Sequence, residues 1–566
     1  MNKVKFFSIA FAVMSIAVNA QDLESAKKAI DAEQYEKAKS ILKGLVTAKP
    51  DYGKNYFFLG NLYLTQKLQD SAAIFFNKGL AAKTDTNLNN IGLGQIELEK
   101  DNEPGAKAIF DKTVLGLKKK DYEEFLYIGR AYMGGAKPNF VTALTYLDKA
   151  KLVQPNDAQV MLSLGDAHYG VRNNNDAFSA YRDSYDADKT VLRAKLQLAR
   201  ITKEAKAFPE ALTQFEAIKI VNPTYGPTYR EMAETYFLMA LNDKDKYAEY
   251  NKTALDFYDK YMSMTDYSLD SRMRHADFLM LTKDYKALEM EANAMQKLDK
   301  VNPRIFRYLG YSAFQTGNLD GAVKALNDFL AAPKAKVIGR DYLYLGMAKT
   351  KKALTTTTTA ADGKSTYAVD QTLFLQGVAD LKKGVEMDPV MANELNDFGK
   401  IYFDIKLYKE AAAIYDVATL NPNSRNFLFD NYYYGYATYF DLASQKVPDA
   451  IQMEKANKAF SNVITIRPTF TDAYIYKARL NSLKENDEVA KAEMAKYYEE
   501  FVKAVILKGE AEVAKPANQK KFVESFNNIA VFYLKTDKMK AKENLEKVLK
   551  LEPANEDAIA NMKFVK

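Results

Sequence analysis

Hydrophobic positions recur along nearly the whole chain at a spacing of about 34 residues, which indicates a repeated unit of supersecondary structure. Each unit has a large apolar residue, a Leu-Gly or Leu-Ala pair and a Tyr, followed later by Ala and another large apolar residue. The clearest examples are Tyr56, Leu59, Gly60, Tyr63, Ala72 and Phe76; Phe306, Leu309, Gly310, Ala313, Ala322, Leu326 and Phe329; and Leu395, Phe398, Gly399, Tyr402, Ala411 and Tyr415. Strand-like alternation is hard to find, so each unit is predicted to be a pair of helices.

Small residues recur on the same face of each predicted helix. Gly inside a helix costs roughly 1 kcal/mol relative to Ala, so its return, as at Gly60 and Gly310, implies that a neighbouring helix comes close. Proline cannot continue a helix and therefore marks the ends of units, at Pro50, Pro155, Pro223, Pro389, Pro422, Pro468 and Pro553. These signals predict about fourteen helix pairs and a final helix, from about Asn555 to Phe564, that caps the stack.

The repeat pattern resembles the tetratricopeptide repeat family over most of the chain. The resemblance implies an all-α fold, a right-handed superhelical solenoid in which the first helices of successive pairs line a concave groove. A solenoid grows by adding repeats, so one continuous domain is expected over residues 21–566. An insertion at about residues 352–371 contains the run Thr355 to Thr359, which has poor helix propensity and no periodic apolar face. A mobile loop is predicted there, either as a contact for a partner or as a tolerated surface insertion.

The resemblance also implies which side chains face a partner, because in this family they lie at fixed positions of each first helix. The matching positions, together with a tyrosine stripe in the aromatic run from Phe427 to Phe440, give these candidate groove residues: Phe57, Asn61, Arg130, Tyr169, Arg230, Phe237, Arg307, Tyr311, Phe314, Tyr432, Tyr436 and Tyr439. Aromatic anchors among single charges are typical of peptide and protein recognition. The alternative is that part of this set packs inside the superhelix, as expected for Tyr433 and Tyr434.

The residue inventory gives little support for catalysis. The chain has no Cys and two His, which leaves out thiolate sites and multi-His metal sites. His168 and His275 occupy the phases of packed repeat residues. No phosphate-binding loop, nucleophile elbow or HExxH helix occurs. The formal net charge of +7 is small for this length, and the basic clusters fall at helix ends or loops. We therefore expect no enzyme, no cofactor, no metal and no nucleic-acid partner.

The first twenty residues have the features of an export signal. Lys3 and Lys5 precede an apolar stretch from Phe6 to Val18, and Val18-Asn19-Ala20 forms a small-residue cleavage site. A cleavable secretory signal peptide is predicted over residues 1–20. A lipoprotein would need a Cys after the signal, which is absent, and a Cys-free exported chain is ordinary for a bacterial envelope. The leader and the richness in Lys, Asn and Tyr are similar to exported proteins of the Bacteroidota. The expected location is the periplasm, with association with the outer membrane as a further option.

These features favour a non-catalytic periplasmic scaffold or adaptor that binds proteins or peptides in the groove of a solenoid. Envelope or outer-membrane proteins are the expected partners, and no integral membrane span is expected. Two alternatives stay open: a glycan-binding protein associated with the outer membrane, or a non-catalytic subunit of an envelope enzyme or secretion complex. Binding to a glycan array would favour the first alternative, and co-purification of a defined protein would favour the scaffold.

Overall fold

The computed structural model describes residues 22–333, 335–359, 365–484 and 486–565. The contacts within the chain divide it into two compact units, residues 1–300 and 301–566. The single continuous solenoid domain expected over residues 21–566 stays a prediction. The predicted signal peptide lies outside the described residues.

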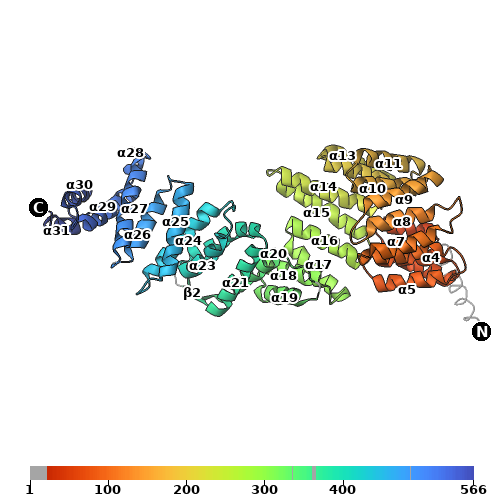
Figure 1. The fold of residues 1–566 in the computed structure, drawn as a ribbon, viewed down its shortest axis with the longest axis horizontal. Coiled ribbons are helices and arrows are strands. Elements are labelled where there is room, and N and C mark those ends of the chain that lie inside the picture. The colour runs from red at the N-terminus through yellow and green to blue at the C-terminus, as the bar shows by residue number, and fades with distance from the viewer. Residues whose placement is uncertain (1–21, 334, 360–364, 485, 566) are drawn as a thin grey trace, which may run out of the picture. The chain divides into compact units, whose positions relative to one another are not determined.

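The N-terminal unit contains eight helix pairs that follow one another in chain order (Figure 1). The pairs are α2 (Leu23–Asp31) with α3 (Tyr35–Ala48), α4 (Gly53–Thr65) with α5 (Gln69–Leu80), α6 (Asn87–Glu99) with α7 (Glu103–Val114), α8 (Glu123–Gly134) with α9 (Phe140–Val153), α10 (Ala158–Gly170) with α11 (Asn174–Ala187), α12 (Leu192–Glu204) with α13 (Phe208–Val221), α14 (Gly226–Asn242) with α15 (Tyr247–Met264), and α16 (Leu269–Thr282) with α17 (Tyr285–Leu298).

The C-terminal unit contains six more pairs. They are α18 (Pro303–Thr316) with α19 (Leu319–Ala331), α20 (Gly339–Ala353) with α21 (Gln371–Met387), α22 (Leu395–Asp404) with α23 (Tyr408–Ala418), α24 (Phe427–Ala443) with α25 (Ala450–Ile466), α26 (Thr471–Ser482) with α27 (Glu488–Ile506), and α29 (Pro516–Tyr533) with α30 (Lys538–Leu551). A 3-10 helix η2 (Pro389–Glu394) precedes α22, and a short helix α28 (Glu510–Val513) precedes α29. The last helix α31 (Glu556–Met562) packs Ala558 against Leu545 of α30. The all-α architecture of about fourteen pairs with a final capping helix is therefore confirmed in the described part of the chain.

A left-handed backbone residue marks the turn between the two helices in eight of the fourteen pairs. These residues are Glu33, Lys67, Asp101, Arg172, Lys206, Lys283, Gly317 and Lys406. In several turns the next amide donates to a carbonyl five residues earlier, as from Leu68 N to Tyr63 O at 2.9 Å and from Asn102 N to Glu97 O at 2.9 Å. This bond pairs a carbonyl left free at the end of the first helix and sets the direction of the second helix. Only one of the eight is glycine, so glycine is a poor sequence marker for these turns.

The recurring helical glycines are sites of close approach between the two helices of a pair. A Cβ added at Gly60 would collide with the ring of Phe76, and one added at Gly310 would lie 2.5 Å from Cγ of Leu326. In most pairs the close neighbour is a large side chain of the second helix, whereas the sequence predicted a backbone. The predicted backbone approach occurs at Gly346, where a Cβ would lie 2.6 Å from the carbonyl oxygen of Gly377.

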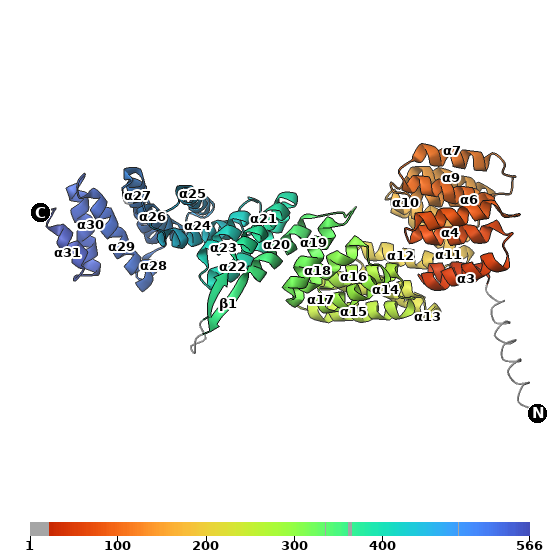
Figure 2. The ribbon, with the colours of Figure 1, turned by 90° about the horizontal axis from the view of Figure 1, so that it is seen from below.

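The insertion between α20 and α21 forms a β-hairpin in its described part, so the prediction of a mobile loop is wrong there. Strand β1 (Leu354–Thr359) pairs antiparallel with β2 (Ser365–Val369), and a register irregularity lies between Thr356 and Thr358. Figure 2 shows the strands extending away from the helices of their unit. Threonine has poor helix propensity because it is β-branched, and the same branching favours strands. The run is therefore better suited to extended structure than to a loop.

Candidate functional site: the inner groove of the N-terminal unit

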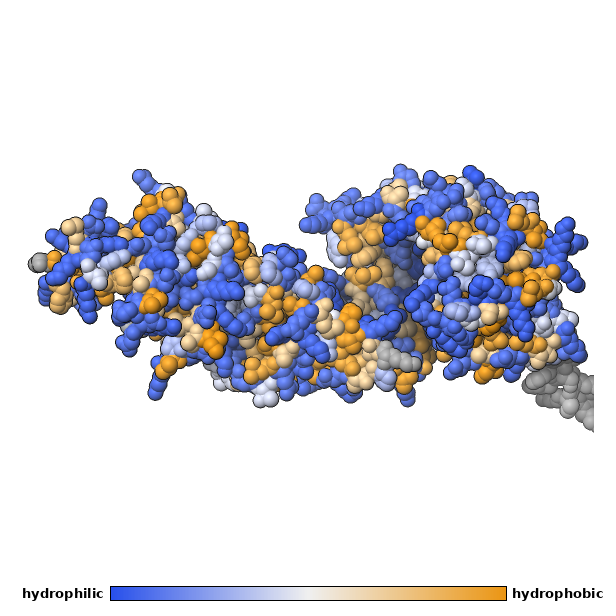
Figure 3. Space-filling view, in the orientation of Figure 1, coloured by the Kyte–Doolittle hydropathy of each residue, from blue (hydrophilic) through white to orange (hydrophobic). Residues whose placement is uncertain are grey.

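A groove of about 1040 Å³ lies within the N-terminal unit. Its walls come mainly from the first helices of seven successive pairs, α2, α4, α6, α8, α10, α12 and α14. Representative lining residues are Lys28 and Asp31 on α2, Asn61 on α4, Gln95 on α6, Arg130 on α8, Asp166 on α10, Arg193 and Arg200 on α12, and Arg230 on α14. The lining therefore combines charged and amide side chains with apolar ones. On the face drawn in Figure 3, hydrophilic and hydrophobic residues are likewise intermixed.

The groove forms because each first helix packs on its second helix with one face and lines the interior with another. On α10, Gly165 receives the ring of Tyr181 from the second helix of the pair. Leu162, Asp166 and Tyr169, which are four and three residues apart and share another face, line the groove. The packing face is thus fixed by small residues, and the inner face is free to carry the residues that decide specificity.

Asp166 joins three elements at the groove wall. Arg193 Nη2 donates to Asp166 Oδ2 at 2.8 Å, and the Tyr181 hydroxyl donates to Asp166 Oδ1 at 2.9 Å. The Asp166 charge raises the pKa of the Arg193 guanidinium, so the guanidinium stays charged. Burial raises the pKa of the nearby Asp31 carboxyl, although Arg193 opposes that effect.

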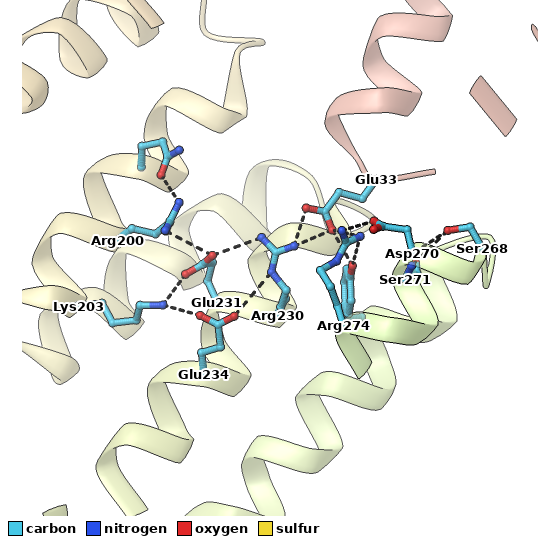
Figure 4. Close-up of polar contacts among 12 residues, drawn as sticks. Glu33, Arg200, Lys203, Arg230, Glu231, Glu234, Ser268, Asp270, Ser271 and Arg274 are labelled. Atoms are coloured by element: carbon cyan, nitrogen blue, oxygen red, sulfur yellow. Dashed lines mark hydrogen bonds and ion pairs between the residues drawn. The ribbon is translucent and has the colours of Figure 1, made fainter. Parts of the chain in front are cut away.

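Glu231 is the centre of a second charge network, which Figure 4 shows. Its side chain is 2% exposed and accepts from Lys203 Nζ at 2.6 Å, with Arg200 and Arg230 at 3.5 and 3.4 Å. Burial alone would raise the pKa of Glu231, but Lys203 and the two arginines outweigh it, so the pKa lies below its usual range. Lys203 Nζ also donates to Glu234 at 2.8 Å. Charges from α12 and α14 are therefore compensated before any ligand arrives.

Five of the predicted residues line this groove: Phe57, Asn61, Arg130, Tyr169 and Arg230. Arg130 Nε donates to Ser163 Oγ at 2.8 Å and its Nη2 to Gln159 Oε1 at 2.8 Å, so its guanidinium bridges α8 and α10. The Tyr169 hydroxyl donates to Glu204. The buried Oδ1 of Asn61 has no hydrogen-bond partner within the described structure.

Three predicted residues are buried, which differs from the exposed position expected of them. Phe57 is 1% exposed because the rings of Phe58 and Tyr127 cover it, so it adds little area to the groove. Phe237 is 9% exposed and packs on Phe278 with ring centroids 5.9 Å apart. Tyr311 is 1% exposed. These side chains support packing between repeats.

In the C-terminal unit, two predicted residues, Arg307 and Tyr311, bind the buried Asp341, and a third, Phe314, packs beside them. Arg307 Nε and Nη2 donate to the two oxygens of Asp341 at 2.7 and 2.8 Å, and the Tyr311 hydroxyl donates to it at 2.7 Å. The Tyr311 ring stacks on Tyr344 with centroids 4.2 Å apart, and Phe314 contacts the same ring edge-on at 5.3 Å. This group therefore joins α18 to α20.

The three predicted tyrosines of α24 belong to a larger group of half-buried rings, which we call the aromatic strip. Its members are Phe403, Tyr408, Tyr432, Tyr433, Tyr436, Tyr439, Phe440 and Tyr476. Tyr436 lies 4.4 Å from Tyr476 and 5.1 Å from Phe403 between ring centroids. Tyr434, expected in the core, is 5% exposed. The strip thus spans α22, α23, α24 and α26 with rings that are partly open to solvent.

Sequence reasoning missed several charged residues of the groove. Arg200 lies 34 positions after Asp166 in the numbering, so the repeat pattern extended to the weaker sixth pair would have found it. Glu33 lies in a turn, where the pattern assigns no role. The predicted packing of His275 is confirmed, since it is 9% exposed and stacks on Tyr258 at 5.3 Å.

Across the described ranges, no three His, Cys, Asp or Glu side chains are grouped so as to hold a metal ion. No helix in the same ranges has the length and hydrophobicity needed to cross a bilayer.

No protein-family model and no curated protein matches the chain. Solved structures with similarity include the C-terminal part of a TPR repeat-containing protein from Cytophaga hutchinsonii, at 20% identity over 51% of this chain and 98% of that chain, with a TM-score of 0.29. MamA has 20% identity over 30% of this chain and 97% of that chain, with a TM-score of 0.25. YrrB, described as a TPR protein with an unusual peptide-binding site, has 18% identity over 32% and 94%, with a TM-score of 0.18. Because these TM-scores are low, the tetratricopeptide-like architecture rests on the fourteen helix pairs themselves.

Proposed function

We propose that the N-terminal unit binds an extended segment of a protein partner in its inner groove, and that the chain acts as a non-catalytic scaffold or adaptor. The observation that carries this proposal is the inner face of successive first helices, which presents one continuous set of charged, amide and apolar side chains. Such a lining suits a peptide, because main-chain amides need polar partners while side chains need apolar ones.

The arrangement of the charged side chains favours the binding of a partner over catalysis. Arg193, Glu231 and Lys203 already have counter-charges within hydrogen-bond distance. Preorganised wall groups reduce the ordering cost of binding, because few of them must move when a partner arrives. The location that fits this role is the periplasm, on the strength of the export signal predicted over residues 1–20.

Photo-cross-linking from inside the groove tests the proposal. A benzophenone amino acid at Asn61, which lines the groove, should capture a partner in intact cells. The same amino acid at the exposed Lys112 on α7 is the matched control. Mass spectrometry of the adduct identifies the segment that is in contact.

The captured segment must then bind the purified chain as a synthetic linear peptide in calorimetry. Gln197→Trp, which fills the groove from α12, should weaken that binding about tenfold or more. Peptide affinity that is the same with and without the tryptophan would contradict the proposal, as would cross-links that form from Lys112 and not from Asn61.

Glycan binding is a second candidate function, and the aromatic strip is the observation that favours it. Its half-buried rings present faces and hydroxyl groups together, so an amphipathic ligand could contact both. A glycan array probed with the full chain and with a Tyr436→Ala, Tyr439→Ala variant tests this function. Signals that are equal for both proteins would exclude the strip as a glycan site.

A further inference from the structure

The turn between α2 and α3 contacts the seventh and eighth helix pairs of the same unit. Glu33 accepts from Arg230 Nη1 on α14 at 2.5 and 2.7 Å, from the Tyr261 hydroxyl on α15 at 2.6 Å, and from Arg274 Nη2 on α16 at 3.3 Å. Figure 4 shows Glu33 between Arg230 and Arg274. One carboxylate thus joins the first pair to three later helices.

The start of α3 is also held by the later helices. Gln34, the residue before α3, makes no side-chain cap, and its amide Nε2 donates to Met264 O at 3.1 Å. The backbone amides of Glu36 and Lys37, in the first turn of α3, both donate to Asp266 Oδ2. Asp266 therefore supplies the N-terminal cap of a helix that lies 230 residues earlier. We call these interactions of Glu33, Gln34, Glu36 and Lys37 the closing contact.

The closing contact lies at the wall of the groove. Glu33 and Arg230 both line the groove, as does Asp31 on α2. Elsewhere in the groove wall, consecutive helices are held together by buried apolar residues. Between α2 and α14 the join consists mainly of ion pairs and hydrogen bonds, with Ala32 as a small apolar contact. Such a polar join is the part of the wall that can open without unpacking a core.

We infer that the closing contact is a gate: when it is formed it closes the side of the groove, and its release admits a bulky chain between α2 and α14. The nature of the chain that enters rests on the proposed peptide-binding function, whereas the opening itself does not. We expect a small reagent to enter the groove without release of the closing contact, so the gate should discriminate by size.

The absence of cysteine from the chain allows a test without any partner. Gln197→Cys places a single thiol in the groove, and its alkylation is timed with N-ethylmaleimide and with a maleimide on a long polyethylene glycol chain. Glu33→Gln and Asp266→Ala are each combined with this reporter. Lys112→Cys on the outside of α7 is the matched control, where the two reagents should keep a constant rate ratio.

We expect release of the closing contact to raise the ratio of bulky to small reagent rates at Gln197→Cys by about tenfold, with no change at Lys112→Cys. Hydrogen exchange in the same variants should quicken at residues 34–38 and stay unchanged in α8 to α11, which shows that the rest of the unit is folded. A bulky reagent that reacts freely in the parent protein would overturn the gate, because the side of the groove would already be open. Faster exchange at residues 34–38 with an unaltered reagent ratio would also overturn it. If the gate is confirmed and no peptide binds, the proposed function alone fails.

Discussion

The inner groove of the N-terminal unit and the aromatic strip of the C-terminal unit use similar repeats in different ways. In the groove, charged side chains of α12 and α14 pair with one another around Glu231. In the strip, rings of α22, α23, α24 and α26 contact each other, and the Arg479 guanidinium lies over one of them, Tyr476, at 4.9 Å. The repeat fixes which face is available, whereas the residue type decides whether that face is an ordered set of charges or an adaptable apolar surface.

The largest effect should come from removing the central carboxylate of the groove. Glu231→Ala leaves Lys203, Arg200 and Arg230 without their shared partner in a buried site, which should destabilise the N-terminal unit by about 4 kcal/mol. Urea unfolding followed by hydrogen exchange in each unit measures this loss. Glu234→Ala is the matched control, because Glu234 also binds Lys203 but is 41% exposed, and it should cost less than about 1 kcal/mol. Equal losses from the two variants would show that the network is not buried in the way described.

Overpacking a helix pair should have a slightly smaller effect, confined to the other unit. Gly310→Leu forces a side chain against Leu326 and should cost the C-terminal unit about 3 kcal/mol. Gly44→Leu on α3, where no atom lies within 4 Å of an added Cβ, should leave the N-terminal unit as stable or more stable. Differential scanning calorimetry resolves the two units. If Gly310→Leu lowered the transition temperatures of both units, this would show that the units unfold together.

The two units should respond to pH with opposite signs. Asp430 on α24 is fully buried, and burial raises its pKa to about 7, although Asn396 donates to it at 2.6 Å. A carboxyl whose pKa is raised on folding destabilises the fold as pH rises from its ordinary value, about 4, to its folded value. Asp430→Asn should therefore stabilise the C-terminal unit by a few kcal/mol at pH 8 and have little effect at pH 4.

The N-terminal unit provides the contrast. Glu33 and Glu231 have lowered pKa values because neighbouring cations outweigh burial, so their contribution is present above about pH 4.3 and is lost as pH falls through their folded values. Unfolding measured between pH 3 and 8 checks both signs. If Asp430→Asn left the pH dependence of the C-terminal unit's stability unchanged, the raised pKa assigned to Asp430 would be wrong.

The smallest effect concerns binding at the strip. Replacing Tyr432, Tyr436 and Tyr439 by Ala should weaken a partner held there by about 2 kcal/mol, measured by surface plasmon resonance with the captured protein. Because the rings contact one another, thermal stability should also fall. The matched triple Phe variant keeps the rings and should retain both properties. If affinity depends on Gln197 and is indifferent to the three tyrosines, binding belongs to the groove alone.

Local pattern was enough to predict much of the fold. Gly60, Gly310 and their equivalents fixed the packing face, and the resemblance to the tetratricopeptide repeat family then implied that Asn61, Arg130 and Tyr169 line the inner face, as they do. The burial of Phe57 and Tyr311 could not be predicted in this way, because Tyr127 and Tyr344 that cover them come from other repeats.

Two further features depend on information that a repeat pattern does not hold. Glu33 acquires its partners from helices about two hundred residues later, a separation at which no periodicity connects residues. The threonine run has poor helix propensity and no periodic apolar face, but its β-branched side chains favour a strand once a pairing segment such as Ser365–Val369 follows.

The cap that Asp266 gives to α3 has a consequence for the order in which the chain acquires its structure. Synthesis proceeds from the N-terminus, so α3 leaves the ribosome long before the carboxylate that completes it exists. Until then its first amides depend on water, and a chain shortened before residue 266 keeps that unfinished end permanently.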